Sequence, residues 1–321
     1  MWAAAALGTG QVVPGYLTAS IGWVRRPVSP KRALIVAVAA LVAVAVALAI
    51  SLSRTAAPGY VPPFNRVVVI VFENHEYGQI IGNPAAPSFN SLAGHYALLT
   101  NYYAVAHPSL PNYLAMISGS TQGITSDCAS CHVDAPNLAD TLESAHKSWK
   151  VYAEGLPSPG FTGTVSGLYV KWHIPFLFFN DVLQSPARLR RIVPLSSLPG
   201  DLSARKLPDF SLIVPNLCHD IHYCPVATGD AWLSTFLPSL LSSPELKRGV
   251  VFVAFDEGVE TDKAHGGGHI PVVVAGPLVR AGARATELLD HYGLLRTIEQ
   301  SWGLTQLGQS GSAAPITGIW R

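Results

Sequence analysis

The stretch RVVVIVFEN, residues 66–74, decides how this chain folds. The apolar run that ends at Phe72 is typical of a strand buried on both faces of a sheet. We predict further strands at residues 98–104, 149–153, 210–214, 249–255 and 270–275. We predict helices at residues 110–117, 137–147, 230–241 and 292–302. Strands that alternate with helices indicate an α/β layered domain, with a mostly parallel central sheet flanked by helices.

The composition excludes two classes of protein. Of the 321 residues, 49% are hydrophobic and 13% are charged, and the mean hydropathy is +0.30. A disordered chain needs low hydrophobicity and a high net charge, so this chain is expected to fold. The formal net charge is +1, and without a basic excess we expect no nucleic-acid partner.

Much of the hydrophobic excess lies in residues 33–52, where Ser51 is the only polar side chain. Twenty apolar residues are long enough to span a bilayer as a helix, and basic residues before the run place the N-terminus in the cytoplasm. A cleaved signal peptide remains the alternative, because small residues follow the run. The catalytic part is then extracytoplasmic, either anchored or secreted. Residues 1–57 hold five basic and no acidic residues, so the rest of the chain carries a net charge of −4.

Four segments follow from this organisation. We expect a basic cytoplasmic segment at residues 1–32, an anchor or signal helix at 33–52, a linker at 53–65 and a catalytic domain at 66–321. Residues 155–209 are rich in proline, glycine and serine, and predict a long irregular insertion near the site.

The chain has four cysteines, which predict two short disulfide-closed loops on the oxidising side of a membrane. The simplest pairing is Cys128 with Cys131 and Cys218 with Cys224. A zinc site is the alternative for the first pair, because two cysteines at this spacing are a common half-site. Five residues separate the second pair, which is not the usual spacing for zinc.

Two predicted strands end in acidic motifs. Glu73 and Asn74 follow the first strand, and Asp256 and Glu257 follow the strand at residues 249–255. Sites in open α/β sheets form outside the carboxyl ends of the strands, so these side chains can offer four oxygen ligands to one divalent cation. The simpler alternative is that each pair only marks a strand that leaves the core.

The segment HPSLPNY, residues 107–113, predicts a nucleophile. Ser109 reads as the N-cap of an apolar helix, with Pro111 in the first turn. A serine there lies among free backbone N–H groups, which bind phosphate and stabilise an alkoxide. A neighbouring metal ion lowers the pKa of the hydroxyl further. An ordinary serine cap is the alternative reading.

Histidines mark three more candidate positions. Asp220 and His222 lie in a loop after the strand at residues 210–214, where they can bind metal, hold phosphate or protonate a leaving group. His269 follows three glycines whose backbone can approach an anion, or which form a flexible loop. His173 lies among apolar residues and, taken alone, reads as a structural histidine.

Together these motifs resemble the bacterial phosphoesterase family of acid phosphatases and phospholipases C, within the alkaline-phosphatase-like superfamily. The residues that carry the resemblance are Val71-Phe72-Glu73-Asn74-His75, Thr100-Asn101-Tyr102-Tyr103, His107 through Ala115, Pro215-Asn216 with Asp220 and His222, Gly229-Asp230-Ala231-Trp232, Asp256-Glu257-Gly258, His291-Tyr292 with Leu295-Arg296-Thr297-Ile298-Glu299, and Ala314-Pro315-Ile316-Thr317. The match covers about residues 65–320 and is similar above all to short secreted acid phosphatases, some described as phosphatidylinositol-3-phosphatases.

The resemblance implies a role for each candidate residue. Metal-binding positions of the family correspond to Glu73, Asn74, Asp256 and Glu257, and the nucleophile corresponds to Ser109. Catalytic positions correspond to His222, Asp220 and His173, which replaces the structural reading of His173. Phosphate or substrate contacts are expected from Asn112, His107 and His269, although Asn112 can instead position the start of the helix.

Two departures from the family pattern concern phosphate contacts. Trp172 stands where the family usually has lysine, and His269 stands where it often has arginine. Histidine is charged only when protonated, so these changes predict a stronger dependence of activity on acid pH.

The predicted function is an exported, metal-dependent phosphomonoesterase that forms a phosphoseryl intermediate on Ser109. We expect a divalent metal cofactor, a small-molecule or lipid phosphate ester as substrate, membrane contact through the N-terminal helix, and a monomer. A phospholipase C-type phosphodiesterase on the same scaffold is the first alternative. A catalytically silent, membrane-tethered binding domain is the second. A sulfatase is disfavoured because the arginine of its maturation motif is missing after Ser109.

Overall fold

The computed structural model describes residues 59–321. The predicted basic segment and anchor, residues 1–52, lie outside this range, as do residues 53–58 of the predicted linker. No helix within residues 59–321 combines the length and apolar composition needed to cross a bilayer.

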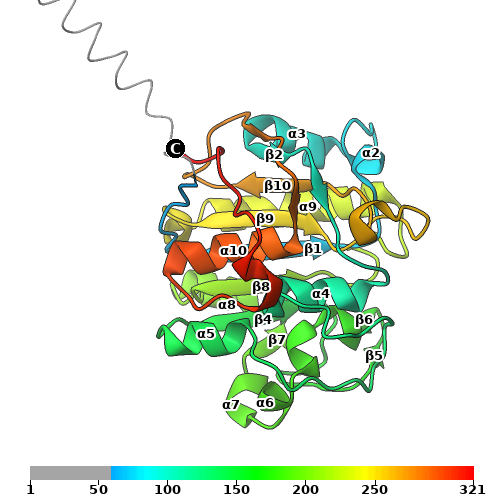
Figure 1. Cartoon of the computed structure of the whole chain (residues 1–321), viewed down its shortest axis with the longest axis vertical. Helices are drawn as coiled ribbons and strands as arrows, with labels where there is room; N and C mark the ends of the chain where they lie inside the picture. Colours follow the sequence, from blue (N-terminus) through cyan, green and yellow to red (C-terminus); the bar gives the residue numbers. More distant parts are fainter. Residues whose placement is uncertain (1–58) are drawn as a thin grey trace, which may run out of the picture. The chain divides into compact units, whose positions relative to one another are not determined.

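A single eight-stranded sheet forms the centre of the described part (Figure 1). In spatial order its strands are β11 (Arg284–Ala285), β2 (Ala97–Leu99), β10 (Val272–Ala275), β9 (Val250–Phe255), β1 (Val67–Phe72), β8 (Phe210–Val214), β4 (Trp149–Ala153) and β7 (Ile192–Pro194). All neighbouring pairs are parallel except those of β10, which runs antiparallel to β9 and β2. The predicted α/β class with a mostly parallel sheet is confirmed.

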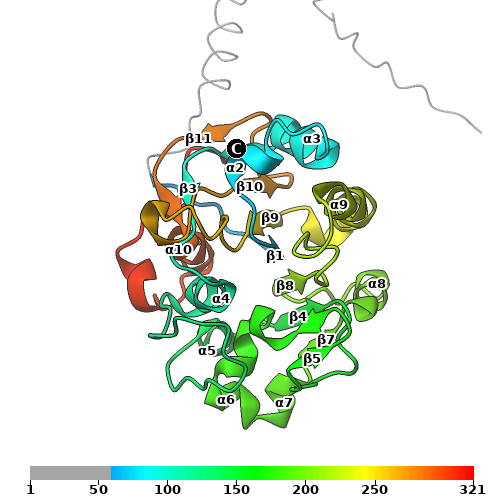
Figure 2. The ribbon, with the colours of Figure 1, turned by 90° about the vertical axis from the view of Figure 1, so that its right-hand side faces the viewer.

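Helices cover both faces of this sheet (Figure 2). One face carries α4 (Ser109–Ser118), α5 (Leu138–Ser144) and α10 (His291–Trp302), and the other carries α3 (Pro87–His95), α8 (Leu198–Ser203) and α9 (Val226–Leu241). The remaining named elements are short: α2 (Tyr77–Ile80), α6 (Asn180–Leu183), α7 (Pro186–Leu189), β5 (Val165–Ser166) paired with β6 (Tyr169–Val170), and β3 (Tyr102–Tyr103) paired with β12 (Leu289–Asp290).

The structure differs from the sequence prediction at several places, among them helix α3, which was not predicted. The strand expected at residues 98–104 is two strands, because the chain leaves the main sheet at Thr100 and pairs next with β12. Helix α9 begins four residues before Asp230, directly after Pro225. The predicted irregular insertion contains β7, an edge strand too short to be recognised from its sequence.

Both predicted disulfides are confirmed. Cys128 pairs with Cys131, and Cys218 pairs with Cys224. No free cysteine lies among the described residues, so the zinc alternative for the first pair is ruled out. Two structural disulfides indicate that this part of the chain folds in an oxidising, extracellular type of environment.

The loop that carries Asp220 is held against the sheet by a close approach of α9. A Cβ atom added to Gly229 would lie 2.7 Å from the carbonyl oxygen of His219, so only glycine fits there. The next residue, Asp230, accepts hydrogen bonds from the backbone N–H groups of Ser88 and Phe89 at the start of α3. The Gly229-Asp230 motif is therefore structural: it joins two helices and fixes a loop of the site.

A buried glutamate ties the C-terminal segment to α10. Glu299 is fully buried, and it accepts hydrogen bonds from the backbone N–H of Leu307 at 2.9 Å and the hydroxyl of Ser310 at 2.6 Å. Burial raises the pKa of Glu299 to about 7 from the ordinary value of 4.5. The folded state thus holds a proton that the unfolded chain releases at a lower pH.

We therefore expect folding stability to fall between pH 5 and pH 7 because of Glu299. Its contribution is complete below pH 4.5 and is lost as the pH rises through about 7. The loss amounts to about 3 kcal/mol for this carboxyl group. Denaturant unfolding of the wild type and of Glu299→Gln at pH 5 and pH 8 checks this, because the variant has no proton to release. Equal pH dependence in the two proteins would contradict the assignment.

Candidate active site

The site is built around the hydroxyl of Ser109, at the carboxyl edge of the sheet. Its Oγ atom lies 3.0 Å from Glu73 Oε2, 3.2 Å from Glu257 Oε1 and 3.4 Å from Asn74 Oδ1. The backbone N–H of Asn74 donates to Asp256 Oδ1 at 3.1 Å, which joins the two acidic motifs. A hydroxyl has one proton, so it can satisfy only one of these acceptors.

These oxygens converge because β1 and β9 are parallel neighbours in full register. Phe72 pairs with Phe255, so Glu73 and Asp256 leave the sheet side by side. The four oxygen-bearing residues that follow the two strands, Glu73, Asn74, Asp256 and Glu257, therefore all lie together around Ser109, as their positions at the strand ends predict.

Four buried carboxyl groups share this site, since Asp220 joins Glu73, Asp256 and Glu257. Burial, together with the charges of Asp256 and Asp220, raises the pKa of Glu73 well above its usual range. Burial likewise raises the pKa of Asp220 to about 8 and that of Glu257 to about 8. Such a cluster stays protonated or requires a cation.

No lysine or arginine within residues 59–321 forms an ion pair with this cluster. Every ion pair that the four groups make within residues 59–321 is with a histidine. Three buried atoms at the site also lack a hydrogen-bond partner: His173 Nε2, Asp220 Oδ2 and Asp256 Oδ2. Unpartnered buried donors and acceptors are rare in folded proteins, and all three are atoms of types that bind metal ions.

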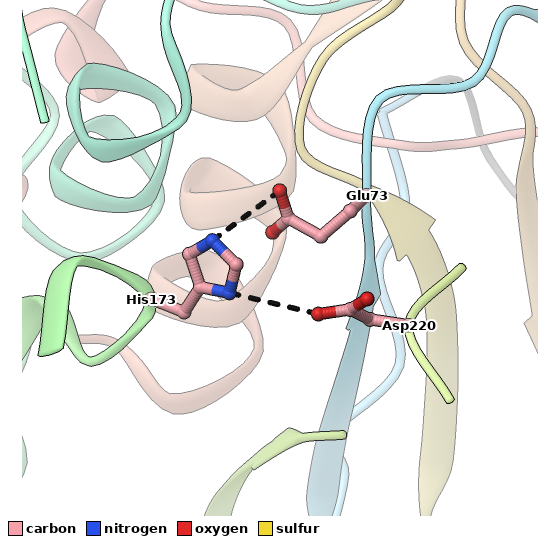
Figure 3. Close-up of side chains that lie close together, drawn as sticks. All are labelled: Glu73, His173 and Asp220. Carbon is pink, nitrogen blue, oxygen red and sulfur yellow. Dashed lines mark ion pairs between the residues drawn. The ribbon is translucent and has the colours of Figure 1, made fainter. Parts of the chain in front are cut away.

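His173 lies between two of the carboxyl groups (Figure 3). Its Nε2 atom is 3.4 Å from Glu73 Oε2, and its Nδ1 atom is 3.7 Å from Asp220 Oδ2. The ligand atoms of these three residues lie within 4.8 Å of one another, close enough to share a metal ion. Burial lowers the pKa of His173 to about 3, so the ring is neutral and suited to metal binding rather than proton donation.

His222 occupies the opening of the site. Its side chain is 28% exposed, and its Nδ1 atom lies 3.8 Å from Glu73 Oε2. The backbone N–H of His222 donates to Asp220 Oδ1 at 2.8 Å, a local turn that fixes the loop. His222 is therefore open to solvent beside the cluster, whereas the side chain of His173 is 2% exposed.

Helix α4 starts one residue earlier than predicted, so Ser109 is its first residue and Pro108 is the N-cap. Capping comes from a distant residue: Asp127 Oδ1 accepts a hydrogen bond from the N–H of Leu110 at 2.9 Å. Pro111 has no N–H, so among the first three helix positions only the amide of Ser109 remains to bind a phosphate oxygen. The helix end contributes less to anion binding than the sequence suggested.

Two of the residues expected to bind phosphate are instead committed to holding the site together. Asn112 is fully buried, and its amide bonds to the backbone of Val105, Ala106 and Pro108. Of the two roles considered for it, the structure supports positioning of the helix start. His107 contacts Glu257 through Nδ1 and the carbonyl oxygen of Asp262 through Nε2.

His269 also has its ring nitrogen engaged away from Ser109. Nε2 lies 3.1 Å from the carbonyl oxygen of Thr100, and the ring stacks between Tyr77 and Tyr103, with centroids 4.6 Å and 5.0 Å away. These contacts fix the glycine-rich loop against α2 and β3. Phosphate contact by His269 therefore has no support in the geometry.

Two residues of the site were missed by the sequence analysis. Tyr113 donates a hydrogen bond to Glu73 Oε1 and stacks on His173, with ring centroids 5.2 Å apart. Tyr113 lies four residues after Ser109 and therefore on the same face of the helix. This spacing alone could have identified Tyr113 as a residue of the site. Asp127 caps α4 from the disulfide loop, and no local sequence pattern marks that role.

Comparison with known proteins places this site in context. A profile described as the Phosphoesterase family matches residues 83–305. The phosphatidylinositol-3-phosphatase of Mycobacterium tuberculosis is 37% identical over 265 residues, which cover 82% of this chain and 85% of that protein. An acid phosphatase of Aspergillus fumigatus is 31% identical, and the alignment covers 80% of this chain but 59% of that longer protein.

Solved structures with a similar fold are more distant in sequence. A protein of the alkaline phosphatase superfamily from Vibrio parahaemolyticus superposes with a TM-score of 0.56 at 14% identity, covering 77% of this chain and 69% of that one. A sulfatase from Pseudoalteromonas sp. gives a TM-score of 0.54 at 12% identity, covering 80% and 73%. At 14% and 12% sequence identity, these structures show only that the sheet and helices of this chain are arranged as in those proteins.

Proposed function

Because the chain belongs to the phosphoesterase family, whose members hydrolyse phosphoric esters, we propose that it is a metal-dependent phosphomonoesterase with Ser109 as its nucleophile. The observation that carries this proposal is the position of the Ser109 hydroxyl, which lies within 3.4 Å of three acidic or amide oxygens. These oxygens belong to a buried cluster whose ion pairs are all with histidines. That environment suits a serine activated beside a divalent cation.

The residues present fit such a cation. The oxygen-bearing side chains around Ser109 would hold it: Glu73, Asn74, Asp256 and Glu257. Asp220 and the neutral His173 form a second set of ligand atoms that shares Glu73 with the first. When bound, a divalent cation lowers the pKa of a neighbouring hydroxyl and offsets phosphate charge.

Side chains of the site carry out the two steps of hydrolysis. In the first step Ser109 Oγ gives its proton to Glu73 and forms a bond to phosphorus, while the bond to the leaving oxygen breaks and His222 gives that oxygen a proton. Water then gives a proton to His222 and attacks the phosphoseryl group. The bond from phosphorus to Ser109 Oγ breaks, Ser109 takes its proton back from Glu73, and inorganic phosphate is released. Tyr113 and His107 hold Glu73 and Glu257 in place during both steps.

The role of His222 predicts a dependence on the leaving group. For His222→Asn we expect hydrolysis of an alkyl phosphate such as glycerol phosphate to slow about 100- to 1000-fold, because an alkoxide leaves poorly without a proton. Hydrolysis of p-nitrophenyl phosphate should slow less than about tenfold, because nitrophenolate needs no proton to leave. Steady-state kinetics on both substrates check this. An equal loss on both would assign His222 to binding or folding instead.

The substrate class follows from the relatives. We propose monoesters, including phosphoinositides, because the mycobacterial relative is named a phosphatidylinositol-3-phosphatase and the fungal relatives are named acid phosphatases. A panel of p-nitrophenyl phosphate, phosphoinositides and bis-p-nitrophenyl phosphate with added magnesium, manganese, calcium or zinc tests this. Hydrolysis of the diester alone would favour the phosphodiesterase alternative.

The arrangement of the whole chain remains part of the proposal. We propose that residues 66–321 are the catalytic domain, that residues 33–52 direct export as an anchor or signal segment, and that the enzyme acts outside the cytoplasm as a monomer. The two disulfides support an exported domain.

A further inference from the structure

Exposed apolar side chains gather at one place on the described surface. Five large apolar side chains are exposed within residues 59–321, and three of them lie in two adjoining loops. These three, Val165 at 54%, Leu168 at 43% and Tyr223 at 68% exposure, are called the apolar rim below. Single exposed apolar residues are normal, but a group of them marks a binding surface.

Backbone hydrogen bonds hold the members of the apolar rim together. The N–H of Leu217 donates to the carbonyl oxygen of Leu168 at 3.1 Å, and the carbonyl oxygen of Leu217 accepts from the N–H of Tyr223 at 2.7 Å. Val165 lies in the same hairpin as Leu168, because β5 pairs with β6. The disulfide between Cys218 and Cys224 closes the second loop. The rim is thus presented on a fixed frame.

The apolar rim adjoins the opening of the site. The ring of Tyr223 packs against that of His222, with centroids 4.8 Å apart, and His222 in turn lies 3.8 Å from Glu73. In Figure 1 the β5–β6 hairpin lies at the same side of the molecule as the start of α4. Whatever carries the phosphate to Ser109 therefore lies next to the rim.

The loops of the rim expose little charge that would oppose entry into an apolar environment. In the disulfide-closed loop Asp220 is buried, and His219 pairs with Glu154 at 2.9 Å. Residues 155–170 contain no acidic or basic side chain, and His222 is the only titratable group of residues 221–224 apart from Tyr223 itself. An exposed tyrosine beside aliphatic tips suits the boundary between lipid headgroups and acyl chains, where its hydroxyl stays in water.

We propose that the apolar rim inserts into a lipid surface, so that the enzyme acts on phosphate esters of lipids while they remain in that surface. This inference rests on the proposed phosphatase function and adds a surface that the function alone does not require. Contact between the rim and the lipid would hold the phosphate of a headgroup at the opening beside His222.

The activity test uses the full chain and the double variant Val165→Ser with Leu168→Ser. Each substitution removes apolar contact with the lipid and should weaken the partitioning of the protein from water onto the vesicle surface about tenfold. We therefore expect hydrolysis of phosphatidylinositol 3-phosphate in phosphatidylcholine vesicles to fall at least tenfold, while hydrolysis of soluble p-nitrophenyl phosphate stays within about twofold. The matched control is Leu288→Ser, because Leu288 is as exposed as Val165, at 54%. Leu288 directly precedes β12, which pairs with β3, and β3 lies far from the β5–β6 hairpin (Figure 2).

A binding test does not depend on catalysis. Leu168→Trp should show a blue-shifted emission with phosphatidylcholine vesicles and quenching by brominated lipid, whereas Leu288→Trp should show neither. Both variants carry the same residues 33–52, so vesicle binding through that segment affects them equally. Equal quenching in both, or equal loss of activity on both substrates, would overturn the inference. A wild type that binds lipid through the rim but hydrolyses no phosphate ester would refute the proposed function alone.

Discussion

Ser109→Ala should lower the rate of phosphate monoester hydrolysis by at least about 10⁴-fold, the scale seen when an enzyme loses its nucleophile. The hydroxyl is 2% exposed and has no substitute nearby, because its neighbours are carboxyl and amide oxygens that stay fixed by other bonds. A residual rate would reflect water attacking the bound phosphate. Steady-state kinetics on p-nitrophenyl phosphate with added divalent metal measure the effect.

Ser211→Ala is the matched control for this substitution. Ser211 is also buried, and its hydroxyl has no hydrogen-bond partner, so its removal should cost neither stability nor activity. If Ser109→Ala keeps more than about a tenth of the wild-type rate while Ser211→Ala is normal, then Ser109 is not the nucleophile.

Removal of the cation should have the second largest effect. We expect a chelator to abolish phosphatase activity and a divalent ion to restore it, because four buried carboxyl groups then lose the charge that balances them. A ligand present at 100 times its dissociation constant stabilises a protein by about 2.7 kcal/mol. For a domain of this size that shift raises the melting temperature by about 5–10 °C.

Two glutamate variants separate this effect from a general loss of stability. Glu73→Gln should lose most of the metal-dependent rise in melting temperature, because Glu73 contributes to both sets of ligand atoms. Glu299→Gln, an equally buried glutamate outside the site, should keep it. Full activity after chelation, with no effect of added ions on melting, would show that the carboxyl cluster works without a metal.

The sequence predicted those parts of the fold that local pattern controls. The predicted bounds of β4 and β8 agree with the structure to the residue, because each is an apolar run ended by loop-forming residues. After Leu99 the chain leaves the main sheet, where β2 pairs with β11, and β3 then pairs with β12 in a separate small sheet. Both partner strands lie nearly 190 residues later in the sequence. No local pattern contains that information.

The same distinction applies to the site. Glu73 and Asp256 were placed correctly because both follow parallel strands, and the sheet itself brings such ends together. The position of His173 between Glu73 and Asp220 could not be predicted from local pattern, since it lies within the irregular insertion at residues 155–209, and only the family resemblance gave it a role in the site. His107 was chosen for phosphate contact, and Asn112 for phosphate contact or for positioning the helix start; in the structure the hydrogen bonds of both hold the site together.

The central claim, that Ser109 carries the phosphoryl group, can be tested directly by trapping the intermediate. Wild-type protein is mixed with a monoester bearing labelled phosphate, quenched in acid within the first turnover, digested and analysed by mass spectrometry. The account predicts labelled phosphate on the peptide that contains Ser109, and no label in Ser109→Ala. Inorganic phosphate released in a burst without any labelled peptide, or label on another residue, would contradict it.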